Sequence, residues 1–398
     1  MSTHVNRFNN TLISIDKIFD CRSFRVLYLE DKRFASSAKK QGLLRNSLNF
    51  IKTNLAVNKI LGPTVDQVTK EIDLTDKTCL ITGTNSGIGL EMTRCLSNKN
   101  CTVVMACRNT YATDVVTKKY CESTDRLKLY ELNLASLASV KKCSDKLLRN
   151  IPKLDIVILN AGVFGLPWTL TEDSLETTFQ VNYLSHYYLL MNIERLLAPD
   201  ARVVLVSSES HRHVNWPFSY QLSPTKEMVS LPPHEYTSIR AYNISKLCEI
   251  LFMHYLGYRW LNTGKAVFSC HPGSFVKTGL CRNWWPYELL YTVMKPFSKT
   301  ITQAAAQPIF CATSPVLNNL TDQYYKDFQQ CHESPLAQDL QLAFRIHYLT
   351  EEMLIERVSF LEEMQAIDEK KEKIKEEDYP DQSKDAIDDN ALVANYSG

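Results

Sequence analysis

The segment that constrains this chain most is LITGTNSGIGLEMTRCL, residues 80–96. A short apolar run leads into three glycines, and a helical pattern follows directly. Glycines let the backbone turn tightly and approach a pyrophosphate, while the N-terminus of the helix offers N–H groups to the same anion. This order of strand, glycine turn and helix predicts a dinucleotide site. We expect its residues to be Gly83, Thr84, Asn85, Ser86, Gly87, Ile88 and Gly89.

Short apolar runs and helical patterns alternate from residue 78 to residue 273. Apolar runs without polar alternation are typical of parallel strands that are buried on both faces, and helices between them provide the crossovers. The sequence therefore predicts an α/β fold, a Rossmann-type doubly wound parallel sheet with helices on both faces. Ligands of such sheets bind beyond the carboxyl ends of the strands. We expect strands within 78–83, 102–108, 127–134, 154–162, 201–210 and 266–273, and helices within 88–97, 110–122, 136–150, 175–197 and 240–252.

Charge is distributed unevenly along the chain. The formal net charge is +1, which gives no reason to expect nucleic acid as a partner. Residues 1–60 nevertheless carry eleven Lys and Arg against four Asp and Glu, and residues 361–398 carry five Lys against twelve Asp and Glu. Such ends are typical of solvated tails. We expect one catalytic domain at 72–358, preceded by a basic extension at 1–71 and followed by an acidic, disordered tail at 359–398.

The chain contains twelve cysteines and no C-x-x-C pair, so neither a zinc site nor a disulfide framework is indicated. Buried, reduced thiols favour a cytoplasmic location, and the basic start leaves a mitochondrial or nuclear location as an alternative. No apolar run approaches the roughly 18 residues of a membrane helix, so we expect no transmembrane segment. Because His211, His213 and His271 lack the spacing of metal ligands, we expect no metal.

The residue that follows the second predicted strand bears on the choice of nicotinamide cofactor. An acidic side chain at this place would hydrogen-bond the ribose of NAD, whereas a guanidinium suits the 2′-phosphate of NADP. The chain has MACRNT here, with Arg108 in that position. NADP(H) is therefore favoured, with a surface salt bridge of Arg108 as the alternative.

The helical segment RAYNISKLCEILF, residues 240–252, places Tyr242 and Lys246 four residues apart and hence on one face. A free tyrosine has a pKa of about 10, too high for an efficient base at neutral pH. A nearby ammonium favours the phenolate and lowers that pKa. The pair could therefore move protons, although the same spacing also occurs by chance in many helices.

Five motifs in this order give the pair its context: the glycine turn, LNAG at 159–162, VSS at 206–208, AYNISK and HPG at 271–273. With them the chain resembles the short-chain dehydrogenase/reductase family. Within about 73–358 it is most similar to the oxidoreductase domain of those members that also carry WW domains. WW domains need paired tryptophans, and the N-terminal segment has none, so binding of WW-type partners is not expected. The five tryptophans are Trp168, Trp216, Trp260, Trp284 and Trp285.

The resemblance implies roles for particular residues. Tyr242 would be the proton donor or acceptor, and Ser208, rather than Ser207, would hold the substrate oxygen. Lys246 would also bind the cofactor ribose, and Asn182 would anchor a water that relays protons. Asn133 replaces the family's usual aspartate near the adenine, where an amide can still hydrogen-bond. Further cofactor contacts are implied for Asn160, Ala161, Gly162, Tyr242, Lys246, Pro272 and Gly273.

The resulting prediction is an NADP(H)-dependent oxidoreductase that interconverts a small lipophilic carbonyl and its alcohol. The long segment between Ser208 and Tyr242 contains Trp216, Phe218 and Tyr220 and could roof the substrate, as could Phe275 from the other side. These aromatic residues suggest a retinoid- or steroid-like substrate, although they could equally form core. A homodimer is implied by the resemblance. The alternative is a catalytically weak scaffold or signalling protein that binds cofactor and acts through protein partners.

Overall fold

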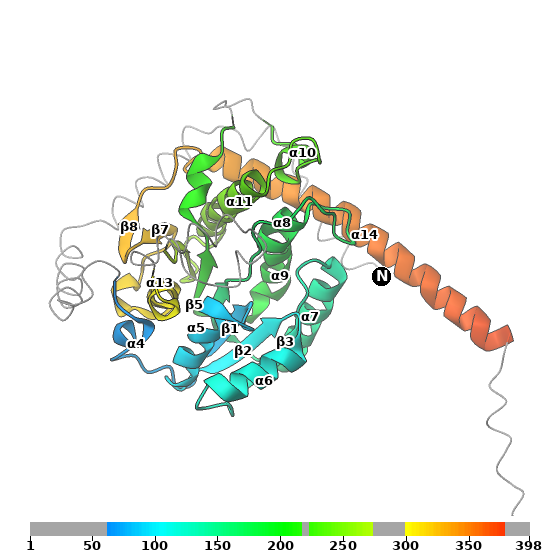
Figure 1. Ribbon diagram of the computed structural model, residues 1–398. Helices are drawn as coiled ribbons and strands as arrows, with labels where there is room; N and C mark the ends of the chain where they lie inside the picture. Colours follow the sequence, from blue (N-terminus) through cyan, green and yellow to red (C-terminus); the bar gives the residue numbers. More distant parts are fainter. Residues whose placement is uncertain (1–61, 217–222, 274–298, 379–398) are drawn as a thin grey trace, which may run out of the picture.

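A computed structural model describes residues 62–216, 223–273 and 299–378. Its centre is an eight-stranded sheet in the order β3-β2-β1-β4-β5-β6-β7-β8 (Figure 1). All neighbouring strands are parallel except the pair β7 and β8, which is antiparallel. The strands are β1 Thr78–Thr82, β2 Thr102–Cys107, β3 Leu127–Glu131, β4 Leu154–Leu159, β5 Leu197–Val206, β6 Ala266–His271, β7 Gln323–Lys326 and β8 Gln329–Cys331.

Helices cover both faces of this sheet, because alternate residues of the apolar strands enter two separate cores. Leu80 of β1 lies in one core, while Cys79 and Ile81 lie in the other. The first core is closed by α7 Leu137–Asn150, α9 Ser185–Ile193, α11 Ser238–Arg259 and α14 Leu340–Asp378. The second core is closed by α5 Gly87–Ser97 and α13 Ile301–Thr313. The doubly wound α/β prediction is thus confirmed.

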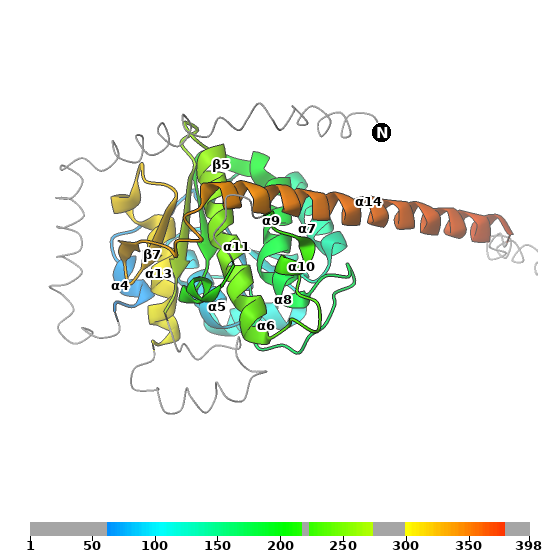
Figure 2. The ribbon, with the colours of Figure 1, turned by 90° about the horizontal axis from the view of Figure 1, so that it is seen from above.

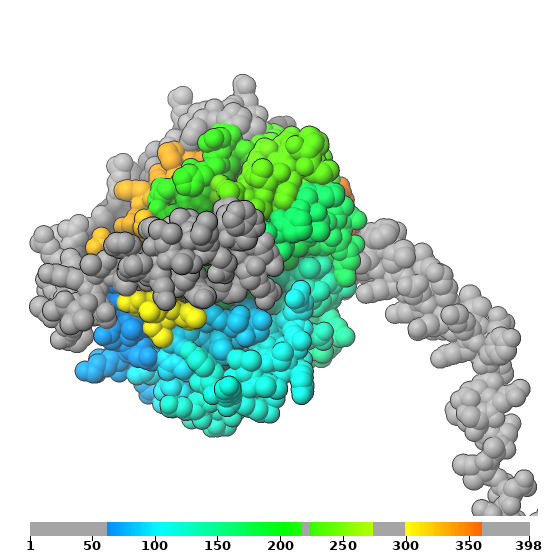
Figure 3. All heavy atoms as spheres, in the orientation of Figure 1, coloured from blue at the N-terminus to red at the C-terminus, as the bar shows by residue number. Residues whose placement is uncertain are grey.

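Four further α-helices complete the described part of the chain. In the space-filling view the blue and cyan part, through α7, lies below the green part that contains α9, α10 and α11 (Figure 3). The remaining helices are α4 Val65–Val68, α6 Thr110–Tyr120, α8 Thr177–Phe179 and α10 Lys226–Val229. Among the described helices, none is long and apolar enough to cross a membrane.

Several elements differ from the sequence prediction, and helices α13 and α14 lie beyond the last predicted strand. The expected helix over 175–197 is interrupted by a π-helical turn, η2 Gln180–Leu184, between α8 and α9. Strands β7 and β8 were not predicted, because each is short and carries glutamines. Residues 1–61 of the predicted extension (1–71) and the end of the acidic tail lie outside the described residues. So do Phe218, Tyr220, Phe275, Trp284 and Trp285.

Helix α14 packs against α11, which it crosses, and continues past the domain, as Figures 1 and 2 show from two directions. Its apolar residues Leu342, Ile346 and Met353 are buried in the core shared with α11. Thr350 is hydrogen-bonded to the Tyr183 hydroxyl at 2.9 Å. The helix runs without a break through residue 358, where the catalytic domain was expected to end, and reaches Asp378.

The two isoleucines of α14 offer a matched test of this packing. Ile346 is 1% exposed and Ile355 is 50% exposed. We expect Ile346→Ala to lower the free energy of unfolding by about 2–4 kcal/mol, because it leaves a cavity against α11. Ile355→Ala should change it by less than about 0.5 kcal/mol. Urea titrations of both variants measure these differences, and equal effects would contradict the packing of α14 on the domain.

Candidate active site

The glycine turn joins the end of β1 to the start of α5. Gly83 has φ +74° and Gly87 has φ +56°, values that L side chains rarely adopt. A Cβ atom on Gly89 would lie 2.2 Å from the carbonyl oxygen of Gly83, so the turn can close only around glycine. The Ser86 side chain makes no capping bond, and Asn85 and Ser86 are exposed. The N-terminal amides of α5 therefore face a polar, accessible turn that fits an anionic pyrophosphate.

The Thr82 hydroxyl links this turn to the strand beside it. Its Oγ1 accepts the backbone N–H of Asn160 at 2.9 Å and that of Ala161 at 3.0 Å. With two donors already present, the hydroxyl hydrogen points to His186 Nε2, which lies at 2.9 Å. His186 Nδ1–H in turn donates to the backbone carbonyl of Asn182 at 2.9 Å. Burial lowers the pKa of His186 to about 4, so the imidazole is neutral, as this chain of hydrogen bonds requires.

Asn182 lies in the π-helical turn, a kind of irregularity that is frequent at functional sites. Its Oδ1 accepts the N–H of Val163 at 2.8 Å, and its Nδ2 donates to Ser245 Oγ at 3.0 Å. A Cβ atom on Gly162 would lie 3.3 Å from Asn182 Oδ1 and 3.9 Å from Lys246 Nζ. The loop after β4, the π turn and helix α11 therefore meet at Gly162.

Tyr242 and Lys246 occupy the first half of α11. Lys246 Nζ lies 5.4 Å from the centroid of the Tyr242 ring. It donates to the carbonyl of Val206 at 2.9 Å and to Glu249 Oε1 at 2.8 Å. Tyr242 is half-buried and packs edge-to-face on Phe164, with ring centroids 4.9 Å apart. The phenol and the ammonium predicted from the sequence spacing thus lie close together.

Ser208 is half-buried and is the second residue after the end of β5. Its Oγ lies 2.7 Å from Ser210 Oγ, and its carbonyl accepts His211 Nδ1–H at 2.7 Å. His211 Nε2 accepts the backbone N–H of Ser334 at 3.0 Å, and burial lowers the pKa of His211 to about 4. The neighbouring Ser207 instead donates to the carbonyl of Lys246 at 2.9 Å and is buried. Of the two serines, Ser208 is the more accessible.

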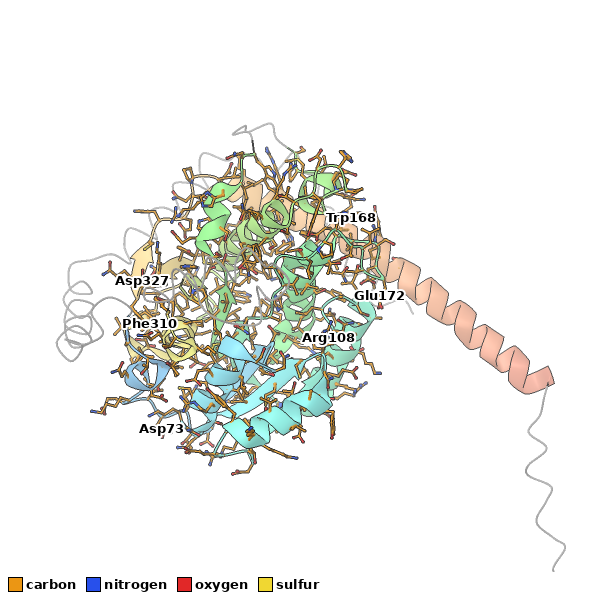
Figure 4. All side chains as sticks on the ribbon, in the orientation of Figure 1. Asp73, Arg108, Trp168, Glu172, Phe310 and Asp327 are labelled. Atoms are coloured by element: carbon orange, nitrogen blue, oxygen red, sulfur yellow. The ribbon has the colours of Figure 1, made fainter. Side chains whose placement is uncertain are left out.

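The other predicted cofactor residues also follow the carboxyl ends of strands. Arg108 is exposed directly after β2 (Figure 4). Asn133 follows β3, and its Oδ1 accepts the N–H of Ala135 at 3.2 Å, which leaves the amide NH₂ available to a ligand. Asn160 Nδ2 donates to the carbonyl of Thr82 at 2.9 Å. Pro272 and Gly273 follow β6 and are half-buried.

The segment between Ser208 and Tyr242 packs on the loop after β4. Trp168 Nε1 donates to the carbonyl of Leu231 at 3.0 Å, and the Tyr236 hydroxyl donates to the carbonyl of Leu166 at 2.8 Å. Trp216, one of the aromatic residues considered as a roof for substrate, is buried in the core. The described part of this segment is therefore held on the side of the sheet where the site residues gather.

Sequence reasoning gave no site role to three buried polar residues: it missed His186 and Glu249, and it considered His211 only as a metal ligand. All three lie within four residues of a residue that the motifs did single out, which is the signal that could have indicated them. Polar residues in helical patterns are otherwise expected on the solvated face. The described residues contain no group of three or more His, Cys, Asp or Glu side chains that could hold a metal ion.

A glycine turn at the first strand, together with a tyrosine and a lysine on one helix beside it, defines a class of oxidoreductase. Residues 77–227 match the family model for short chain dehydrogenases. The WW domain-containing oxidoreductase of Drosophila melanogaster is 40% identical over 300 residues, which cover 73% of this chain and 72% of the relative. The chain belongs to the short-chain dehydrogenase/reductase family, whose members use a nicotinamide cofactor.

Other relatives agree with this assignment. The human WW domain-containing oxidoreductase is 37% identical over 72% of this chain and 70% of its own length. Human retinol dehydrogenase 12 is 32% identical over 71% of this chain and 88% of its own length. A solved structure from Mycobacterium paratuberculosis, 25% identical, covers 71% of this chain and 94% of that chain with a TM-score of 0.56.

The neutral state of His186 predicts a dependence of stability on pH. Its pKa is about 4 in the folded protein and about 6.5 in an unfolded chain. Below pH 6.5 the unfolded chain therefore binds a proton that the folded protein does not, so stability falls as the pH falls toward 4. We expect this group alone to contribute a slope approaching about 1.4 kcal/mol per pH unit.

Urea titrations at pH 7, 6 and 5 measure that slope. His186→Asn should have a shallower slope than the wild type, because it lacks the titrating imidazole. His213→Asn, at an exposed position, serves as the control and should keep the wild-type slope. If the stability of His186→Asn falls with pH as steeply as that of the wild type, His186 is not held neutral in the folded protein.

Proposed function

We propose that the protein is an NADP(H)-dependent oxidoreductase that interconverts a small lipophilic carbonyl and its alcohol, with Tyr242 as proton donor and acceptor. The observation that carries this proposal is the placement of Lys246 and Asn182 beside Gly162, one strand away from the glycine turn, with the Tyr242 ring centroid 5.4 Å from Lys246 Nζ. A proton-transfer group and a cofactor cradle thus share one edge of the sheet.

The residues of the site divide the chemistry between them. The nicotinamide, when bound, supplies or accepts the hydride. Tyr242 gives a proton to the oxygen that forms in reduction, and takes one from the alcohol in oxidation. The ammonium of Lys246 favours the phenolate, and Ser208 donates a hydrogen bond to the same substrate oxygen. Asn182 anchors a water through which Lys246 exchanges protons with solvent.

The preference for NADP(H) rests on Arg108. Its exposed guanidinium follows β2, at the edge of the sheet where the glycine turn also lies, and can reach a 2′-phosphate. In this proposal the amides of the glycine turn hold the pyrophosphate. Asn133 faces the adenine, and Lys246 binds the ribose. The remaining contacts come from Asn160, Ala161, Gly162, Pro272 and Gly273.

Of the retinoid- or steroid-like substrates, a retinoid is supported by the similarity to retinol dehydrogenase 12, which is named for a retinoid alcohol. A cytoplasmic location is supported by the ten described cysteines, all of which are free thiols and nearly all buried. Because α14 covers α11, we propose that any homodimer uses another face. We retain the basic extension to residue 71, the catalytic domain at 72–358 and the acidic tail at 359–398 as the working division of the chain.

Replacement of Tyr242 tests the chemistry. We expect Tyr242→Phe to lower kcat about 10²–10⁴-fold on any carbonyl that the wild type reduces, because the proton donor is lost. NADPH affinity should change little. Tyr258→Phe, at the far end of the same helix, is the matched control and should keep wild-type turnover. The assay uses a panel of retinal, steroid and quinone carbonyls with NADPH fluorescence as the binding readout. Unchanged turnover in Tyr242→Phe contradicts the mechanism, and NADPH binding without turnover in the wild type favours a scaffold.

Replacement of Arg108 tests the cofactor. We expect Arg108→Asp to weaken NADPH binding about 10–100-fold, because a charge-assisted contact is replaced by repulsion, and to improve NADH binding. Arg126→Asp is the matched control and should leave both affinities unchanged. Arg126 is exposed and directly precedes β3, so it lies at the amino ends of the strands, opposite the glycine turn. Fluorescence titrations with NADPH and NADH measure the affinities. Equal wild-type affinities for the two cofactors would refute the role of Arg108.

A further inference from the structure

Glu249 is a carboxylate in the core of the molecule, three residues after Lys246 on α11. It is 2% exposed and Lys246 is 4% exposed. Its Oε1 accepts a hydrogen bond from Lys246 Nζ at 2.8 Å. Burial of a lone carboxylate is costly, and the ammonium offsets that cost. The two groups therefore form one buried ion pair between α11 and the ends of β5 and β6.

Packing alone does not account for this carboxylate. The residues around it on α11, Leu247, Ile250 and Met253, are fully buried and apolar. Replacement of a buried ion pair by apolar residues is often neutral or stabilising, so a core at this place has no need of an acid. The effect of Glu249 on its partner gives it a role, because that partner is the ammonium on which proton transfer by Tyr242 depends.

The charge of Lys246 acts on Tyr242 across 5.4 Å, measured to the ring centroid. The carboxylate of Glu249, 2.8 Å from the same nitrogen, opposes that charge. The phenolate of Tyr242 is therefore stabilised less than it would be by a lone ammonium, because the ion pair has a net charge near zero. The hydrogen bond to Glu249 also fixes the direction of the lysine side chain. We propose that Glu249 is a positioning residue that orients Lys246 and sets the pH range in which Tyr242 transfers protons. This inference rests on the proposed role of Tyr242.

The titratable groups around the pair come from three elements. Tyr242, Lys246 and Cys248 share α11 with Glu249, Cys270 lies on β6, and His186 faces the pair from α9. Burial raises the pKa of Glu249 to about 7, and the charge of Lys246 opposes this rise. Above pH 7 the carboxylate is therefore ionised and opposes the ammonium. This is the range in which the tyrosine must ionise to act as a base.

The test compares pH profiles of kcat/KM for alcohol oxidation. We expect Glu249→Gln to move the limb assigned to Tyr242 to lower pH by about one unit, because the opposing charge is gone. Glu249→Leu should move it equally, and Glu249→Asp should keep it near the wild-type position. Glu91→Gln is the matched control, since Glu91 is fully buried and pairs at 2.8 Å with Arg94, three residues on in another helix. It should leave the limb in place.

A purely structural role gives a different pattern. Glu249→Gln would then retain the wild-type limb, and Glu249→Leu would lose activity equally at every pH; either result overturns the proposal. The ionisation of Tyr242 can also be followed without substrate, by NMR of the protein labelled with ¹³Cζ-tyrosine. The spectrum of Tyr242→Phe assigns the Tyr242 signal. The same downward shift is expected there in Glu249→Gln. If the wild type turns over no carbonyl, the proposed function fails, while an absent NMR shift refutes the role of Glu249 separately.

Discussion

The hydroxyl of Thr82 is the interaction on which the arrangement of the site depends. Its oxygen accepts hydrogen bonds from two backbone amides of the loop after β4, and its hydrogen points to the imidazole of His186. His186 in turn is hydrogen-bonded to the backbone carbonyl of Asn182. The ends of two strands and the π turn are thereby joined through buried hydrogen bonds, which are strong in a low-dielectric interior and costly to leave unmade. Gly162, adjacent to these amides, is thereby held close to Asn182 and Lys246. The proposed cofactor cradle and the proposed proton-transfer group are held in one frame for this reason.

Much of this frame could be predicted from the sequence because it depends on burial. Strands β1, β2, β4 and β6 are buried along almost their entire length, so their sequences are continuous apolar runs. Strand β7, QYYK, and the edge strand β8, QQC, have no such run, since they are short and partly exposed. The π turn could not be predicted either, because it covers only five residues, Gln180–Leu184, too few to give a period of their own within a largely apolar helical segment.

The site divides in the same way. Tyr242, Lys246, Ser208 and Asn182 could be named because they stand in ordered motifs, and the structure brings Tyr242, Lys246 and Asn182 together. His186 and Glu249 could not, because a polar residue within an apolar helical pattern gives no indication of whether it faces solvent or core. Only tertiary packing places His186, which is neutral, beside the Thr82 hydroxyl, and Glu249, which is ionised, beside the ammonium of Lys246.

Two buried ion pairs show why local spacing does not determine such a role. Glu91–Arg94 and Lys246–Glu249 have the same separation along a helix and the same 2.8 Å contact. Arg94 also binds Asp66 at the surface, and its side chain is 19% exposed, so water screens its charge and the pair ties α5 to the segment before β1. Lys246 points instead toward the end of β5 and a phenol ring, where little water competes. Two ion pairs of the same spacing therefore differ in their effect. The Glu91–Arg94 pair stabilises the packing of α5, whereas the Lys246–Glu249 pair acts on a titratable phenol.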